Sequence, residues 1–168
     1  MDIEAVELQR MTATGLTIGS VGVNKGITVT GISAANSHSI TTIVTLITTV
    51  DEQQVVFQHA PSTFYALAVQ ADKGVHMSTD VTTTSNGMYL DGDYENSSSA
   101  DNSPHTAIAN VVSVLDGRTV TAKTVMTLES SASRIVPSGN VTFKAGSGLV
   151  LLDDMKDSMK NQTLIFDV

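Results

Sequence analysis

Apolar and polar residues alternate over short stretches along most of this chain. Residues 69–77 and 143–151 show this most clearly, because both follow the order apolar, any, Ala, any, any, Gly, apolar, any, apolar. Alternation with a period of two is typical of a strand that buries one face. The Gly can adopt a positive φ and the Ala is small enough to face inward. We therefore expect two short strands joined by a corner in each segment.

The same pattern recurs at intervals that indicate a repeat. Residues 21–29 fit it with Val in place of Ala, and residues 120–128 fit it with Val in place of Gly. The sixth positions of the four copies are 26, 74, 125 and 148, which are 48, 51 and 23 residues apart. These intervals are close to two, two and one copies of a unit of about 24 residues. About seven such units would fill the chain.

Short strands and tight corners in a repeat predict an all-β fold, a parallel β-solenoid whose coils of roughly 24 residues stack on one another. One coil cannot bury its own apolar face, so stacking explains a repeated pattern without repeated identity. Seven coils at a strand spacing of about 4.8 Å give a rod of roughly 30–35 Å. The alternative is a β-sandwich, which also has alternating strands and Gly-rich turns. The shared corner and the nearly integral intervals favour the solenoid.

Composition restricts the domain organisation and the partners. The length fits a single domain, residues 1–168, in which the polar stretch 91–104 is expected to be a long loop. With 17 acidic and 9 basic residues the net charge is −8, which argues against a nucleic-acid partner. Neither disulfides nor membrane insertion is expected, because there is no Cys and no apolar run approaches ~20 residues. Both ends have strand-like sequence, so the chain is interpreted either as a whole domain or as one segment of a longer array.

Three segments carry a resemblance to known repeat proteins: residues 15–30, 119–129 and 139–149. Their sequence resembles the haemagglutinin- and autotransporter-type β-helix repeats of large secreted adhesins. It is also similar to the giant repetitive cell-surface proteins of algae and related protists. The resemblance implies an extracellular or cell-surface location, long tandem arrays, and a structural or adhesive role. The chain departs from these proteins in its short length and in first residues that lack the pattern of a signal peptide.

Few residues are candidates for metal binding or catalysis. Asp91, Asp93 and Glu95 alternate in the polar stretch and are a weak candidate for a calcium site, because calcium prefers several oxygen ligands from a flexible loop. Their surroundings do not match a calcium-binding hand loop, and a solvated acidic loop is the favoured interpretation. The sequence has no nucleotide-binding or nucleophile motif, so we expect neither a cofactor nor an enzyme.

Three sequons of the form Asn-X-Ser/Thr make glycosylation possible if a eukaryote secretes the chain. The candidate residues are Asn96, Asn140 and Asn161. Asn96 is the best of them, because it lies in the most polar stretch.

The ends of the chain are candidates for self-association. The open ends of a solenoid carry unpaired N–H and C=O groups, which pair readily with another chain. The candidate residues at the C-terminal end are Leu164, Ile165, Phe166 and Val168, and those at the N-terminal end are Ile3, Val6 and Leu8.

The sequence therefore predicts a structural or adhesive module of an extracellular fibre or cell-surface filament, with copies of itself, stacked end to end, as its partner. The first alternative is an adhesin domain that binds a carbohydrate or a protein on one lateral face. An aromatic platform for a sugar would have to come from Tyr65, Tyr89 or Tyr94, since the chain has no Trp. The second alternative is a polysaccharide-active β-helix enzyme, which would use paired carboxylates in a groove.

Overall fold

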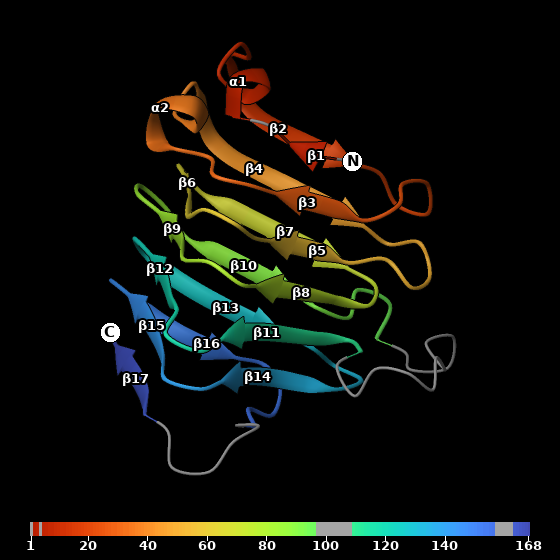
Figure 1. The fold of residues 1–168 in the computed structure, drawn as a ribbon, viewed down its shortest axis with the longest axis vertical. Helices are drawn as coiled ribbons and strands as arrows, with labels where there is room; N and C mark the ends of the chain where they lie inside the picture. The colour runs from red at the N-terminus through yellow and green to blue at the C-terminus, as the bar shows by residue number, and fades with distance from the viewer. Residues whose placement is uncertain (1, 4, 97–108, 157–162) are drawn as a thin grey trace.

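The computed structural model describes residues 2–3, 5–96, 109–156 and 163–168. The chain winds as a parallel β-solenoid with three sheets that run along the length of the molecule (Figure 1). Every strand pair within the described residues is parallel. The predicted all-β solenoid is therefore confirmed, and the antiparallel strands of a sandwich are not found there.

The strands are distributed over three sheets. Sheet A consists of β1 (Asp2–Ile3), β3 (Ile27–Val29), β5 (Val55–Phe57), β8 (Gly74–Met77), β11 (Val111–Leu115) and β14 (Arg134–Ser138). Sheet B consists of β2 (Ala13–Gly19), β4 (Ile40–Thr48), β7 (Leu67–Ala71), β10 (Met88–Asp91), β13 (Val125–Glu129) and β16 (Gly148–Leu151). Sheet C consists of β6 (Ser62–Phe64), β9 (Val81–Thr83), β12 (Thr119–Ala122), β15 (Val141–Ala145) and β17 (Leu164–Asp167). The helices are α1 (Ala5–Leu8) and α2 (Ala34–Ser37).

From β5 to β16 the chain visits the sheets in the order A, C, B, so each coil adds one strand to each sheet. The coils differ in length. Paired residues in sheet A are 20 positions apart from Val55 to Val75 and 28 apart from Ile27 to Val55. From Val75 to Val112 the distance is 37 positions, because most of the polar stretch lies between β10 and β11. Sheets A and B consequently have six strands each instead of the expected seven.

The predicted repeat positions are confirmed only in part. Gly26 and Gly74 stand at the start of sheet A strands two coils apart, and Val125 pairs in register with Gly148 in sheet B. The intervals of 48 and 23 residues therefore correspond to two coils and one coil. The interval of 51 residues is wrong, because Gly74 lies in sheet A and Val125 in sheet B. The corner from sheet B to sheet A and the corner from sheet C to sheet B have similar sequences, and the alignment equated them.

Two of the three glycines of the motif, Gly74 and Gly148, have the positive φ that the sequence predicted, and Gly26 does not. Gly74 has a φ of 138° and Gly148 a φ of 136°, values that other residues rarely adopt. At Gly74 a side chain would also be crowded, since its Cβ would lie 2.8 Å from Nε2 of His76 and 3.0 Å from the carbonyl oxygen of Val111. Both observations explain why glycine stands at this corner.

Inward-facing side chains from all three sheets fill one interior. Ile27 and Val75 of sheet A are fully buried, and Leu149 of sheet B packs against the same cluster. The residues that alternate with these buried positions along each strand point outward. His76 lies on the outer face between the buried Val75 and Met77, as the alternation predicts.

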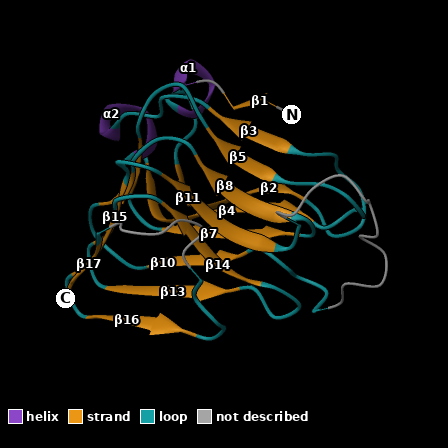
Figure 2. Ribbon diagram, turned by 60° about the horizontal axis from the view of Figure 1, so that its bottom comes forward, coloured by secondary structure: helices purple, strands orange, loops and turns teal. Residues whose placement is uncertain are grey.

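The N-terminal end carries a small helical cap (Figures 1 and 2). The helix α2 contacts β6, and α1 contacts α2, so the two helices occupy the place of sheet C strands in the first two coils. At the start of α2, the Ser33 side chain accepts a hydrogen bond from the Asn36 amide, and the Asn36 side chain accepts one from the Ser33 amide, which is a capping box. Leu8, the last residue of α1, is buried in the core. Neither helix is long or apolar enough to cross a membrane.

Candidate functional site

The C-terminal end of the solenoid exposes residues that belong to its interior. Leu151 in β16 and Phe166 in β17 face inward, because they pair in register with the buried Leu128 and Phe143. They are nevertheless 41% and 45% exposed, since no described strand follows in either sheet. Phe166 stacks on Phe143 with ring centroids 6.0 Å apart. These side chains are core residues without a coil to cover them.

The C-terminal residues predicted for self-association all lie at this end. Ile165 and Val168 are exposed, and Leu164 is half-buried and packs against the core. The strand β17 is held to β15 by its ladder and by an ion pair in which Lys144 Nζ lies 3.3 Å from Asp167 Oδ2. Its other edge has no strand partner among the described residues.

The N-terminal residues predicted for self-association are arranged differently. Ile3 lies in β1, which has two residues, and Val6 is exposed on α1. Leu8 is only 1% exposed and closes the interior instead of forming part of the surface. The expectation that Leu8 contacts another copy is wrong, because the chain forms a helix here that turns this side chain inward.

The three acidic residues Asp91, Asp93 and Glu95 do not form one site, and the first two are not solvated. Asp91 is 4% exposed and accepts a hydrogen bond from the Asp93 amide at 3.0 Å. Asp93 is fully buried and accepts hydrogen bonds from the Ala132 amide and from the Asn110 side chain. A buried carboxylate that accepts backbone N–H groups joins neighbouring coils. The favoured interpretation of a solvated acidic loop is therefore wrong for Asp91 and Asp93.

Glu95 instead lies near two acidic residues from another corner. Ligand oxygens of Asp51, Asp72 and Glu95 lie within 4.8 Å of one another, which is close enough for a shared cation. Asp72 is buried, and its carboxylate accepts a hydrogen bond from the Glu52 amide at 2.7 Å. Asp51 and Glu95 are exposed. We interpret these three residues as contacts that hold neighbouring corners of the coils together, and we assign no ion to them.

Tyr89 links two carboxylates on the outer face of sheet B. Its hydroxyl lies 2.6 Å from Glu129 Oε2 and 3.3 Å from Asp91 Oδ2, and the two acids are paired in register on β10 and β13. Burial raises the pKa of Asp91 to about 6; the hydrogen bond from the Asp93 amide opposes this rise, and the charge of Glu129 adds to it. Burial and the hydrogen bond to Glu129 also raise the pKa of Tyr89. The Tyr89 hydroxyl is thus the hydrogen-bond donor that two neighbouring carboxylates share.

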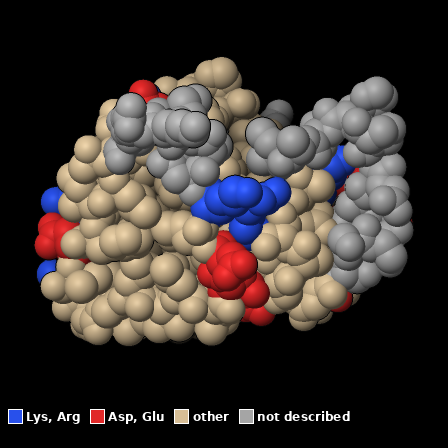
Figure 3. All heavy atoms as spheres, turned by 90° about the horizontal axis from the view of Figure 1, so that it is seen from below, with Lys and Arg blue, Asp and Glu red and all other residues tan. Residues whose placement is uncertain are grey.

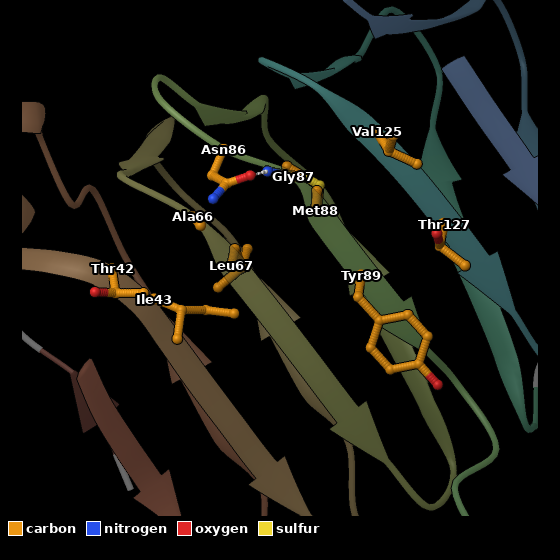
Figure 4. A pocket seen from close by; sticks show the side chains of 10 residues that line it. All are labelled: Thr42, Ile43, Ala66, Leu67, Asn86, Gly87, Met88, Tyr89, Val125 and Thr127. Atoms are coloured by element: carbon orange, nitrogen blue, oxygen red, sulfur yellow. Dashed lines mark hydrogen bonds between the residues drawn. The ribbon is translucent and has the colours of Figure 1, made fainter. Parts of the chain in front are cut away.

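A shallow groove of about 320 Å³ lies beside this cluster (Figure 4). It is lined by two small residues that directly precede adjacent strands, Ala66 before β7 and Gly87 before β10, and by Ile43, Val125 and Tyr89. Figure 4 shows the ring of Tyr89 extending along the strands, away from Ala66 and Gly87. A side chain at Gly87 would be blocked, because its Cβ would lie 2.8 Å from the Val125 carbonyl oxygen. Of the three tyrosines considered as sugar platforms, Tyr89 is the one that lines this groove.

His76 is half-buried on the outer face of sheet A. Its Nε2 atom has no hydrogen-bond partner, and burial lowers the pKa of its imidazole. Its neighbours in register are Val56 and Ser113, and neither is an acid or a metal ligand of the usual kind. We assign no catalytic role to this histidine.

The sequons have different surroundings. Asn96 is exposed at the end of a turn, with a φ of 55°. Asn140 is exposed too, but its Oδ1 accepts a hydrogen bond from the Thr163 amide at 3.0 Å, and its own amide donates to Asp116 Oδ1 at 2.7 Å. Asn140 therefore joins its own corner to the segments that contain Asp116 and Thr163. Asn161 lies outside the described residues.

Sequence reasoning missed the contacts between side chains of different coils. Tyr89 and Glu129 are 40 residues apart, and Asp72 and Glu95 are 23 apart, so no local motif connects them. A correct alignment of the coils would have placed Asp91 beside Glu129, because both end a sheet B strand. Comparison with known proteins adds no information about the site: no family model, no curated protein and no solved structure matches this chain.

Proposed function

We propose that this chain is a structural module of an extracellular fibre or cell-surface filament, and that its C-terminal end joins it to another solenoid end. The observation that carries the proposal is the exposure of the inward-facing Leu151 and Phe166 beside two open strand edges, β16 and β17. Another solenoid end placed there would cover these side chains and pair the free N–H and C=O groups.

The apolar contribution is sizeable for so small a surface. Fully burying a Leu or Phe side chain stabilises an assembly by about 1.5–3 kcal/mol, and these two are nearly half exposed. Each of them is therefore expected to contribute on the order of 1 kcal/mol. Val150, Leu152 and Ile165 are exposed at the same end and add to this. An extracellular setting is proposed because the repeats resemble those of secreted adhesins and cell-surface proteins.

Sedimentation velocity over a range of concentrations tests the proposal. We expect the chain to associate at micromolar concentration, and Leu151→Lys to lower the association constant at least tenfold, because a charge would be buried at the contact. Val23→Lys is the matched control, since Val23 is an exposed apolar residue near the other end. A chain that remains a monomer at several hundred micromolar would contradict the proposal.

A second candidate function is carbohydrate binding, which the groove beside Tyr89 favours. The aromatic ring, the apolar lining residues and the Glu129 carboxylate are the groups that a sugar chain would contact. A glycan array tests it: binding to any glycan should be lost in Tyr89→Ala and retained in Tyr65→Ala. We do not propose hydrolysis at this site, because Asp91 is almost completely buried and its oxygens already accept the Asp93 amide and the Tyr89 hydroxyl.

A further inference from the structure

The N-terminal ends of sheets B and C have features that discourage pairing with another strand. In sheet A the outermost described strand is β1, of which residues 2 and 3 are described. In sheet B the last strand is β2, and its register shifts between Ala13 and Gly15. In sheet C, α2 covers β6. Very short strands, bulges and covering helices are the devices by which proteins protect sheet edges.

At the C-terminal end only sheet A is protected. Its last strand, β14, contains Pro137, which has no N–H to donate. Residues 154–156 also lie along its edge, because the Ile135 amide donates to the Asp154 carbonyl at 2.8 Å and the Lys156 amide donates to the Ile135 carbonyl at 2.9 Å. The edges of β16 in sheet B and β17 in sheet C carry neither device within the described residues. Within the described part of the chain, these two edges at the C-terminal end are therefore open.

We infer that two copies of this chain join tail to tail about a twofold axis that passes through the end of sheet A, so that β16 of each copy pairs antiparallel with β17 of the other. This inference rests on the proposed function and adds the partner and the geometry. A twofold axis through sheet A exchanges the sides occupied by sheets B and C. It therefore places both open edges against open edges and leaves the protected edges of sheet A facing each other.

The heights of the last segments fit this axis. The chain rises by one strand spacing, about 4.8 Å, in each coil, which is roughly 1.6 Å per side. The last segments follow in the order β16, residues 154–156 and β17, so the end of sheet A is intermediate in height. Sheet C extends further along the solenoid axis than sheet B. In the pair, the edge of sheet C in each copy therefore meets the edge of sheet B in the other copy. An axis through sheet B or sheet C would instead set an open edge against the protected one and leave a step.

The side chains at this end are also suited to a second copy. Leu151 and Phe166 point into the interior, and the pairing would place them next to each other in a continuous apolar column. Figure 3 shows this end of the molecule from below, where a basic patch lies beside an acidic patch near the middle and further charged side chains lie at the left edge. Head-to-tail stacking would instead place the open edges against the protected N-terminal end.

Single cysteines test the arrangement, because the natural chain has none. Val150 and Ile165 lie near the middle of β16 and β17, and both pair with outward-facing threonines. We prepare Val150→Cys and Ile165→Cys as separate full-length chains and treat them with a short thiol cross-linker. The mixture of the two should give a cross-linked dimer at least tenfold more efficiently than either variant alone, since cross-strand neighbours lie about 5 Å apart.

The control is Val23→Cys, placed in the exposed loop between β2 and β3 near the N-terminal end. It should not cross-link to either C-terminal variant. Association with efficient cross-linking of Val150→Cys or Ile165→Cys alone would overturn the axis through sheet A. Cross-linking of Val23→Cys to Val150→Cys would show head-to-tail stacking and would overturn the tail-to-tail pair. If sedimentation shows only monomers and no mixture cross-links, the proposed function itself fails.

Discussion

The two ends of this solenoid finish the same interior in different ways. At the N-terminal end, two short helices replace sheet C strands, and Leu8 closes the column with 1% of its surface exposed. At the C-terminal end, Leu151 and Phe166 occupy inward positions of regular strands and remain nearly half exposed. The coils from β5 to β16 differ in length but each adds one strand to each sheet, so the two ends differ where the chain departs from this order.

This difference shows what a repeat protein needs in order to end. A regular strand always presents one more edge and one more layer of apolar side chains, so adding coils never removes the open surface. At the N-terminal end the chain leaves the repeat: α1 and α2 take the place of sheet C strands, and α1 packs Ala5 and Leu8 against the core. The last described strands at the C-terminal end keep the repeat, and they leave Leu151 and Phe166 partly exposed.

The largest expected effect comes from truncating the same residue type at both ends. Leu8→Ala should lower the free energy of unfolding by about 2–4 kcal/mol, because it removes a fully buried side chain and leaves a cavity. Leu151→Ala should cost less than about 1 kcal/mol in the monomer, since its side chain is already partly hydrated. Urea unfolding at submicromolar concentration measures both without contribution from association. Equal losses for the two variants would contradict the contrast between a closed and an open end.

A pH titration separates both ends from the coils between them. Asp91 has a pKa of about 6 in the folded chain and of about 3.9 when unfolded, so the folded state binds this proton more tightly. Its contribution to stability is fully present below about pH 4 and is lost as the pH rises through 6, an effect of about 2–3 kcal/mol. Asp91→Asn should remove this part of the pH dependence and be more stable than the natural chain at pH 7.

The measurement is the difference in unfolding free energy between Asp91→Asn and the natural chain, taken from pH 4 to pH 8. Asp80→Asn is a matched control outside the Tyr89 cluster. Leu8→Ala and Leu151→Ala should lose the same stability at every pH in this range, because neither end contains Asp91. A difference that does not change with pH would show that Asp91 does not titrate in this range.

How far the sequence predicts the fold can be judged from its corners. The alternation around Val75 and the glycine at position 74 were sufficient for a strand, a corner and an inward face, because these depend on neighbours within a few residues. The same local pattern could not tell one corner of the coil from another, so residues 69–77 and 143–151 were aligned although they join different pairs of sheets. The helix α2 has only four residues, which is too short for a helical period to be visible.

The candidate site was less predictable for a related reason. The apolar strand at the C-terminal end was predictable because it is a local feature, and its contact with another copy stays a prediction. Leu8 was misplaced because its burial depends on how α1 packs against residues far along the chain. Asp91 and Asp93 were expected in solvent because acidic residues usually are. Their partners Glu129 and Ala132 come from the next coil, beyond the long polar stretch.

A smaller effect is expected from the cap that distinguishes the N-terminal end. Ser33→Ala removes the acceptor for the Asn36 amide and should lower the free energy of unfolding by about 1 kcal/mol. Hydrogen exchange should become faster in α2 and in the neighbouring β6 while β15 and β17 are unchanged. Ser33→Asp is the conservative control, because it keeps an acceptor at the cap and should restore most of the protection.

The smallest expected effect concerns the corner that holds the last strand at the open end. Asn140→Ala removes the side-chain acceptor of the Thr163 amide, an exposed hydrogen bond, and should cost only about 0.5 kcal/mol. Because β17 has one strand partner, the loss should increase hydrogen exchange in β17 and leave the N-terminal cap unchanged. Asn140→Asp keeps the acceptor and serves as the control. Faster exchange in α2 after Asn140→Ala would mean that the two ends are coupled through the coils, and the comparison between them would no longer be one of independent parts.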